Sequence, residues 1–113
     1  MTNDEERITN YNEFWDFYVA EHSEPLTRRL HFAGTTFGLI LLIWIARTGN
    51  WIYLPLCFVV GYAFAWFAHF FIEHNKPATF KRPLWSFVSD YKMVFYMLTG
   101  KMNGEVERVS QAK

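Results

Sequence analysis

The chain has 113 residues, a formal net charge of zero and a single cysteine, Cys57. The neutral charge balance argues against a broadly basic surface for nucleic acid, and one cysteine excludes a disulfide framework or a cysteine-based zinc site. This length predicts one domain over residues 1–113.

The first predicted element is an amphipathic helix over about residues 10–21. Its large apolar side chains recur at the three- and four-residue spacing of an α-helix, at Tyr11, Phe14, Trp15 and Tyr18. Such a helix either packs on the rest of the protein or lies in a membrane interface, and the sequence leaves both alternatives open.

Two apolar segments follow, at about residues 30–47 and 51–72, with no charged residue apart from Arg47. A helix needs about 20 apolar residues to cross a bilayer. The four connecting residues, "RTGN", are too few for anything but antiparallel neighbours. The predicted fold is therefore an all-α membrane protein, an antiparallel two-helix transmembrane hairpin with amphipathic N- and C-terminal helices. The alternative is a soluble all-α domain in which both helices are buried. A chain of 113 residues has too little polar sequence to cover two such helices on every side.

Caps and small residues refine this hairpin. Ser23 is predicted to cap the start of the first long helix, with Pro25 in its first turn. The pattern "GTTFG" places Gly34 and Gly38 on one helix face, and the second segment offers Gly61 on a matching face. Small residues let helix backbones approach closely in lipid, so these faces are predicted to meet.

A second amphipathic helix is predicted over about residues 83–99, opened by Pro83 and closed by Gly100. Its apolar stripe consists of Leu84, Phe87, Val88, Tyr91, Val94, Phe95 and Leu98. From Asn103 onward we find no apolar period and expect the chain to fray. Basic residues gather in both arms, which predicts cytoplasmic termini, in a bacterial inner membrane or the endoplasmic reticulum.

Three histidines are predicted to meet at the cytoplasmic end of the hairpin. His31 begins the first span and His69 nearly ends the second, so antiparallel packing places them at the same end. His22 lies just upstream, and Glu73 follows His69 by one helical turn on the same face. His74 falls on another face and is left out of the group.

Ionisable residues at membrane depth are costly and usually functional. Three histidines with a carboxylate suit iron, zinc or manganese, and a total of four histidines fits one metal ion. Two alternatives remain. His31 and His69 could be interfacial histidines hydrogen-bonded to each other or to backbone, or two histidines could hold a haem.

Two stretches, "EHSEPLTRRLHFAG" and "HFFIEHNKPATFKRPLW", carry a resemblance to a known family. They resemble a small membrane family, formerly of unknown function, that includes the fungal 2-hydroxy fatty acid dioxygenase of phytosphingosine degradation. The resemblance runs from about Tyr11 to Gly100 and is to the family's short form. Its most specific parts are His22, the R-x-x-H ending at His31, and H-x-x-x-E-x-N-x-P-A from His69 to Ala78.

The resemblance implies an Fe(II)-dependent, membrane-embedded dioxygenase that shortens a 2-hydroxy fatty acid by one carbon with O₂. Carried onto this chain, the family's histidines imply His22, His31 and His69 as iron ligands. Glu73 is implied as a fourth ligand or a catalytic base. His74 stands where members of the family often have lysine.

Further residues are predicted to contact the substrate or support the reaction. Arg28, one turn before His31, can pair bidentately with a carboxylate, although membrane anchoring is the plainer explanation for both Arg28 and Arg29. Tyr62 and Trp66 share the face of His69, where packing is the plainer interpretation. Asn75 is predicted to contact substrate or orient a ligand, or else to cap the helix end before Pro77.

Two other functions compete with the dioxygenase. One is a non-enzymatic membrane protein whose His/Glu cluster only ties the hairpin together. The other is a zinc-dependent lipid hydrolase using the same residues. The predicted partners are membrane lipid, a fatty-acid-like substrate and O₂, without nucleic acid. Two spans bury few helix faces, which allows a homo-oligomer.

Overall fold

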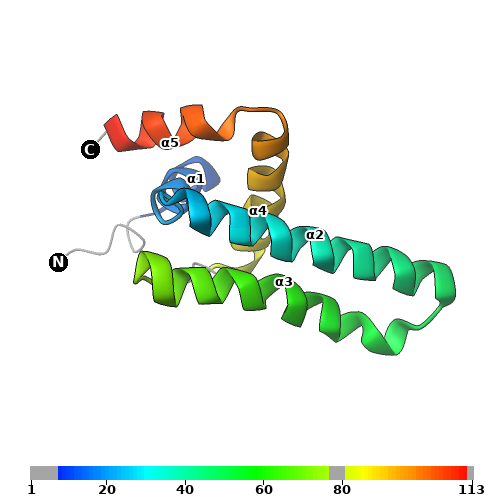
Figure 1. Ribbon diagram of the computed structural model, residues 1–113. Coiled ribbons are helices and arrows are strands. Elements are labelled where there is room, and N and C mark those ends of the chain that lie inside the picture. Colours follow the sequence, from blue (N-terminus) through cyan, green and yellow to red (C-terminus); the bar gives the residue numbers. More distant parts are fainter. Residues whose placement is uncertain (1–7, 77–80, 112–113) are drawn as a thin grey trace. The chain divides into compact units, whose positions relative to one another are not determined.

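The computed structural model describes residues 8–76 and 81–111, where all regular structure is helical (Figure 1). The five α-helices are α1 (Tyr11–Ala20), α2 (Pro25–Thr48), α3 (Leu54–Ala68), α4 (Pro83–Leu98) and α5 (Met102–Gln111). A 3₁₀ helix, η2 (Trp51–Tyr53), precedes α3, and a π-helical turn, η3 (His69–Glu73), follows it. The all-α prediction is confirmed. The predictions for Pro77 and Ala78 lie outside the described residues.

The described helices belong to two compact units. One unit, residues 24–76, contains α2, η2, α3 and η3. The other combines residues 8–23 with residues 81–111 and contains α1, α4 and α5. That the whole chain acts as one membrane domain stays a prediction.

The first of these units is the predicted hairpin, with α2 and α3 lying side by side (Figure 1). Residues Pro25–Thr48 and Trp51–Glu73 are each long and apolar enough to cross a membrane. The connection turns at Gly49, which ends α2 with a left-handed φ of 76°. Glycine adopts this conformation without the steric cost that a Cβ would add.

The start of α2 differs from the prediction. Its N-cap is Glu24 rather than Ser23, and the Glu24 side chain makes no capping hydrogen bond. The residue before a proline is pushed into extended backbone, so Pro25 at the first helical position makes Glu24 the boundary. The backbone N–H of Glu24 donates instead to the Glu73 carboxylate, 2.8 Å away.

The two long helices touch through their smallest residues, as predicted. A Cβ added to Gly34 would lie 2.7 Å from the carbonyl oxygen of Gly61, and one added to Gly38 would lie 3.1 Å from that of Cys57. Real Cβ atoms essentially never approach a neighbour below 3.0 Å. The backbones therefore approach to a distance that only glycine permits at Gly34.

Most of the apolar surface of the hairpin points outward. Only 22% of the most apolar window of Pro25–Thr48 is buried, and only 17% of that in Trp51–Glu73. Exposed side chains include Phe37, Ile40, Ile43, Trp44, Phe58, Val59, Phe67 and Phe71. Apolar helices in a soluble core would be mostly buried, so this exposure argues against that alternative.

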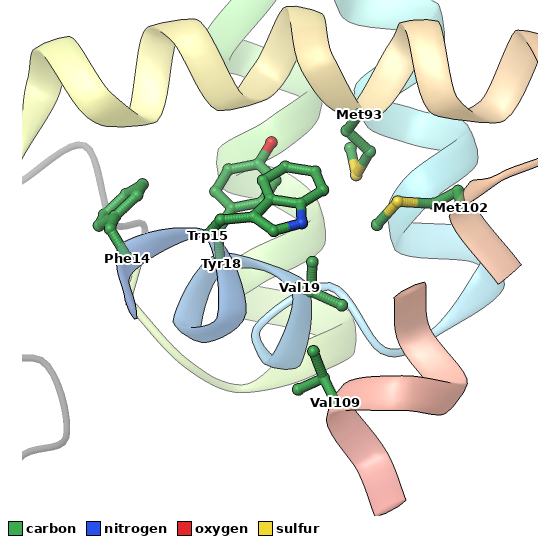
Figure 2. Packing of buried hydrophobic residues seen from close by; sticks show 7 residues of the cluster. All are labelled: Phe14, Trp15, Tyr18, Val19, Met93, Met102 and Val109. Atoms are coloured by element: carbon green, nitrogen blue, oxygen red, sulfur yellow. The ribbon is translucent and has the colours of Figure 1, made fainter. Parts of the chain in front are cut away.

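The second unit has its own hydrophobic core, seen in Figure 2. It consists of Phe14, Trp15, Tyr18 and Val19 from α1, Met93 from α4, and Met102 and Val109 from α5. The amphipathic stripe of α1 is therefore packed inside this unit, which decides between its two predicted roles.

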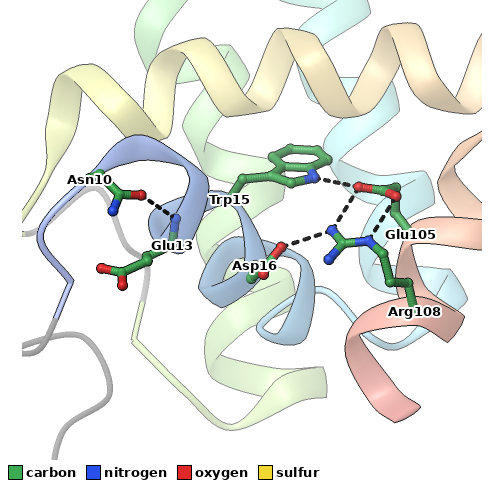
Figure 3. A network of polar contacts seen from close by, with 6 residues as sticks. All are labelled: Asn10, Glu13, Trp15, Asp16, Glu105 and Arg108. Carbon is green, nitrogen blue, oxygen red and sulfur yellow. Dashed lines mark hydrogen bonds and ion pairs between the residues drawn. The ribbon is translucent and has the colours of Figure 1, made fainter. Parts of the chain in front are cut away.

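The prediction of fraying from Asn103 is wrong. Residues Met102–Gln111 form α5, with Met102 and Val109 buried and Val106 packed against the same core. These three residues stand at i, i+4 and i+7, a helical period too sparse to stand out among polar neighbours. Figure 3 shows the polar contacts that join α5 to α1: the Trp15 indole N–H donates to Glu105 at 2.7 Å, and Arg108 bridges Glu105 and Asp16.

Helix α4 presents its apolar stripe to the outside. The exposed residues are Leu84, Phe87, Val88, Tyr91, Phe95 and Leu98, whereas the buried ones are Ser86, Ser89, Asp90 and Met93. Its inner face bonds to α1 through polar groups: the Tyr18 hydroxyl donates to Asp90, and the Tyr11 and Ser89 hydroxyls lie 2.9 Å apart. The stripe of α4 is therefore not packed in the core of this unit.

We expect alanine at Gly34 to destabilise the hairpin, since its methyl carbon would collide with the Gly61 carbonyl and force the helices apart. The control is Gly61→Ala, whose methyl would meet the Gly34 carbonyl at an ordinary 3.8 Å. Overpacking of this kind costs about 1–3 kcal/mol. The measurement is thermal unfolding in detergent. Equal melting temperatures for the two variants would contradict the packing described.

Asp90 should make stability depend on pH. Burial raises the pKa of Asp90 to about 7 from its usual 3.8, against a smaller opposite effect of the Tyr18 hydrogen bond. Between these values the folded protein binds a proton that the unfolded chain has lost, so stability falls as pH rises through 7. We expect Asp90→Asn to flatten the fall in melting temperature between about pH 4 and pH 7.5. Parallel curves for the two proteins would refute this assignment.

Candidate metal centre

The centre of the predicted site is a pair of facing histidines, one from each long helix. His31 lies on α2 and His69 opens η3, and both side chains are buried. Their ring centroids are 5.2 Å apart and the ring planes are nearly perpendicular, at 87°. The predicted meeting of these two residues at one end of the hairpin is confirmed.

A π-helical turn shapes the His69 side of the pair. Such turns are rare and occur often at functional sites. After η3 the chain reverses at His74, whose φ of 59° is left-handed, and the Asn75 N–H donates to the His69 carbonyl at 2.9 Å. This reversal also carries the Asn75 side chain back to the His69 ring.

Each ring of the predicted ligand set is held by a local oxygen acceptor at Nδ1. The Nδ1 atom of His22 lies 2.6 Å from the Tyr18 carbonyl, and that of His31 lies 3.1 Å from the Thr27 carbonyl. For His69 the acceptor is the Asn75 Oδ1, at 2.6 Å. A carbonyl oxygen can only accept, so Nδ1 carries the proton and the lone pair of each neutral ring is on Nε2.

His22 belongs to the other unit, where it follows α1. It is buried, at 1% exposure, and its ring stacks on the Tyr18 ring with a centroid distance of 4.0 Å. Its Nδ1 contact reaches back four residues, the same spacing as in His31. The two acceptors, the carbonyl oxygens of Tyr18 and Thr27, each belong to the residue four positions before the histidine. This spacing is visible in the sequence, although we did not predict the contacts from it.

His31 and His69 could each offer one ring nitrogen to a metal ion, and His22 is the third buried histidine that could join them in holding it. The donor chemistry fits this role. Metal-ligating histidines almost always donate their other ring N–H to a carbonyl, carboxylate or water, which fixes the ring and raises its basicity. A three-histidine set also leaves coordination positions for other ligands.

A buried hydroxyl next to the pair gives a second test of the fit. Thr27 is fully buried, and its Oγ1 has no hydrogen-bond partner among the residues that the structure describes. Leaving such a group unsatisfied costs about 1–3 kcal/mol. Thr27 stands one helical turn before His31, so the unsatisfied hydroxyl belongs to the same stretch of α2 as this histidine.

The predicted acid–base and carboxylate-binding residues lie at the same end of the hairpin. The Glu73 carboxylate accepts the Glu24 N–H, so it closes the start of α2, as well as standing one π-turn after His69. Arg28 is buried and interacts electrostatically with Glu73 and Glu24, whereas Arg29 is exposed. Membrane anchoring therefore suits Arg29 better than Arg28.

Of the remaining residues predicted to contact substrate, Tyr62 and Trp66 lie on α3, whereas Asn75 lies beside His69. Tyr62 and Trp66 lie on α3 with ring centroids 6.3 Å apart; Tyr62 is half-buried and Trp66 is more exposed. Asn75 contacts His69 through its side chain and caps η3 through its backbone. Contact of any of these three residues with a substrate stays a prediction.

Comparison with protein families adds what geometry alone does not give. The Mpo1-like family, described as 2-hydroxy-palmitic acid dioxygenase Mpo1-like, matches residues 8–102. The chain belongs to this family. The match includes all three buried histidines, Arg28, Glu73 and Asn75, and it confirms the resemblance carried by the two sequence motifs. Neither the comparison with curated proteins nor that with solved structures found a match.

Asn75 offers a direct test of the ring-orientation argument. We expect Asn75→Ala to weaken metal binding about 10- to 100-fold, the usual cost of losing a hydrogen bond behind a histidine ligand. Asn75→Asp, which keeps an acceptor for Nδ1–H, should retain most of the affinity. The measurement is titration of the detergent-purified, metal-free protein with Co(II). Unchanged affinity in Asn75→Ala would show that this bond does not support a ligand.

Proposed function

We propose that this chain is an Fe(II)-dependent membrane dioxygenase that shortens 2-hydroxy fatty acids by one carbon. The observation that carries the proposal is the set of three buried histidines that could hold a metal ion, in each of which Nδ1–H donates to a local oxygen and the lone pair of the neutral ring is on Nε2. Membership of the Mpo1-like family, whose description names a 2-hydroxy-palmitic acid dioxygenase, supports a 2-hydroxy fatty acid as the substrate and the involvement of O₂.

His22, His31 and His69 would hold the metal, with Glu73 as a fourth ligand or a base. A bound iron would supply the redox chemistry that O₂ requires. Zinc has the same histidine preference but no redox chemistry, which makes it the natural metal for a hydrolase instead. The dioxygenase description of the family therefore favours iron.

The overall reaction needs no external reductant. A 2-hydroxy acid plus one O₂ gives the acid one carbon shorter, one CO₂ and one water. The bond between C1 and C2 breaks, C1 leaves as CO₂, and C2 becomes the new carboxyl carbon. The two carbons together lose four electrons, the number that O₂ takes up, so the substrate and O₂ balance each other.

The residues around the histidines would position the substrate. Arg28, buried at this end of α2, would pair with the substrate carboxylate through two parallel N–H donors. Glu73 would accept the proton of the 2-hydroxyl at its carboxylate. The acyl chain would lie against the apolar surface of α2 and α3, beside Tyr62 and Trp66. The burial of the histidines would help to keep bulk water away from a substrate bound there.

The same surface supports a membrane location. Two helices of sufficient length and apolar character, with most of their side chains exposed, would bury that surface in lipid. The stripe of α4 from Leu84 to Leu98 would lie in the interface. Basic residues in the arms would keep both termini cytoplasmic.

The test is a stoichiometric assay on Fe(II)-loaded protein in detergent, without added reductant. We expect 2-hydroxypalmitic acid to be consumed with one O₂, yielding one CO₂ and one shortened acid, while palmitic acid stays unchanged. His31→Ala should give no product. Iron-loaded wild-type protein that leaves 2-hydroxy acids of several chain lengths unchanged would overturn the proposal.

A further inference from the structure

A buried tyrosine–aspartate pair lies behind His22 and has no part in the proposed chemistry. Tyr18 on α1 is 1% exposed, and its hydroxyl donates to the carboxylate of Asp90 on α4. Asp90 is itself buried, in a helix whose inner face is otherwise serine and methionine. Burying an acidic side chain costs free energy, so the position of Asp90 needs a structural or functional explanation.

Tyr18 fixes His22 in two ways at once. Its carbonyl oxygen accepts the His22 Nδ1–H at 2.6 Å, which selects the tautomer. Its ring lies over the imidazole with a centroid distance of 4.0 Å and an interplanar angle of 22°, which limits tilting of the imidazole. The hydroxyl bond to Asp90 holds the far end of that ring, so the tyrosine cannot swing away.

We propose that Tyr18 and Asp90 are positioning residues that hold the His22 imidazole in the orientation needed to bind the metal. The proposal rests on the metal site described under the proposed function. His22 follows the last turn of α1 rather than lying within a helix, so it needs this support more than His31, which is held inside α2. A ligand held by its neighbours loses less freedom when it binds metal.

The competing explanation is that the Tyr18–Asp90 bond merely joins α1 to α4. A matched contact separates the two explanations. The Tyr11 hydroxyl lies 2.9 Å from Ser89 Oγ, and it joins the same two helices through the residue adjacent to Asp90. Tyr11 stands two helical turns before Tyr18, at the start of α1, whereas His22 follows the end of that helix. Tyr11→Phe and Tyr18→Phe therefore remove the same atom from the same helix pair.

The experiment titrates Co(II), a spectroscopic substitute for Fe(II), into the metal-free full-length protein in detergent. Affinity, the visible absorption spectrum and the melting temperature are recorded for each variant. We expect Tyr18→Phe to weaken Co(II) binding about 10-fold, which is the lower end of the loss in affinity seen when the support of a histidine ligand is removed. The visible absorption spectrum of the bound Co(II) should also change. Tyr11→Phe should lower the melting temperature comparably while leaving affinity within about twofold. Asp90→Ala, which removes the acceptor of the Tyr18 hydroxyl, should change affinity in the same direction as Tyr18→Phe.

A His22→Ala background makes the test specific. There the supported ligand is gone, so adding Tyr18→Phe should cause no further loss of affinity. Equal affinity in Tyr18→Phe and Tyr11→Phe, or a further loss in the His22→Ala background, would overturn the positioning role. Wild-type protein that binds no Co(II) or Fe(II) would overturn the metal site itself, and the inference with it.

Discussion

The close approach of α2 and α3 is the constraint on which the candidate site depends. Gly34 leaves no room for a Cβ against the Gly61 carbonyl, and Gly38 leaves little against Cys57. A contact between two backbones tolerates little sliding, because a shift along the helix would bring larger side chains into the gap. The register fixed in this way sets His31 opposite His69. The same hairpin exposes apolar side chains over most of its outer surface, which is the kind of surface that lipid covers. Its inner surface, where the two helices meet, carries His31 and His69.

The second feature is that each histidine is held by its own stretch of chain. His22 and His31 donate to the carbonyl one turn earlier, and His69 donates to the residue that caps its helix. These contacts form when the local backbone forms and do not await a metal. The rings are thus preorganised, with Nδ1–H bonded to the protein and the lone pair of the neutral ring on Nε2. The π-turn and the left-handed His74 are the local distortions that bring Asn75 into this role.

Much of the fold followed from the sequence because its signals were strong. The apolar segments of α2 and α3, the stop at Gly49 and the facing glycines each have a direct physical meaning. The meeting of His31 with His69 followed from antiparallel geometry alone. The sequence was weaker wherever the outcome depended on tertiary partners. The apolar stripe of α4 gave no sign that it would face outward, since Ser89 and Asp90 became inner residues only through their bonds to tyrosines on α1. Likewise α5 is stabilised by the packing of Met102 and Val109 in the core of the second unit, because its own sequence shows only a weak helical pattern. The contact of Asn75 with His69 required the π-turn, which no periodicity predicts.

The central claim is that the three buried histidines hold one iron ion. The most direct test is metal analysis of the full-length protein, purified in detergent without oxygen and without a metal-affinity tag. The account predicts about one iron per chain after Fe(II) is offered, and loss of that iron when His31 or His69 is replaced by alanine. Protein that takes up no metal would contradict the account and reduce the histidines to a structural cluster. Protein that takes up zinc in preference to iron would contradict the dioxygenase assignment and favour a hydrolase.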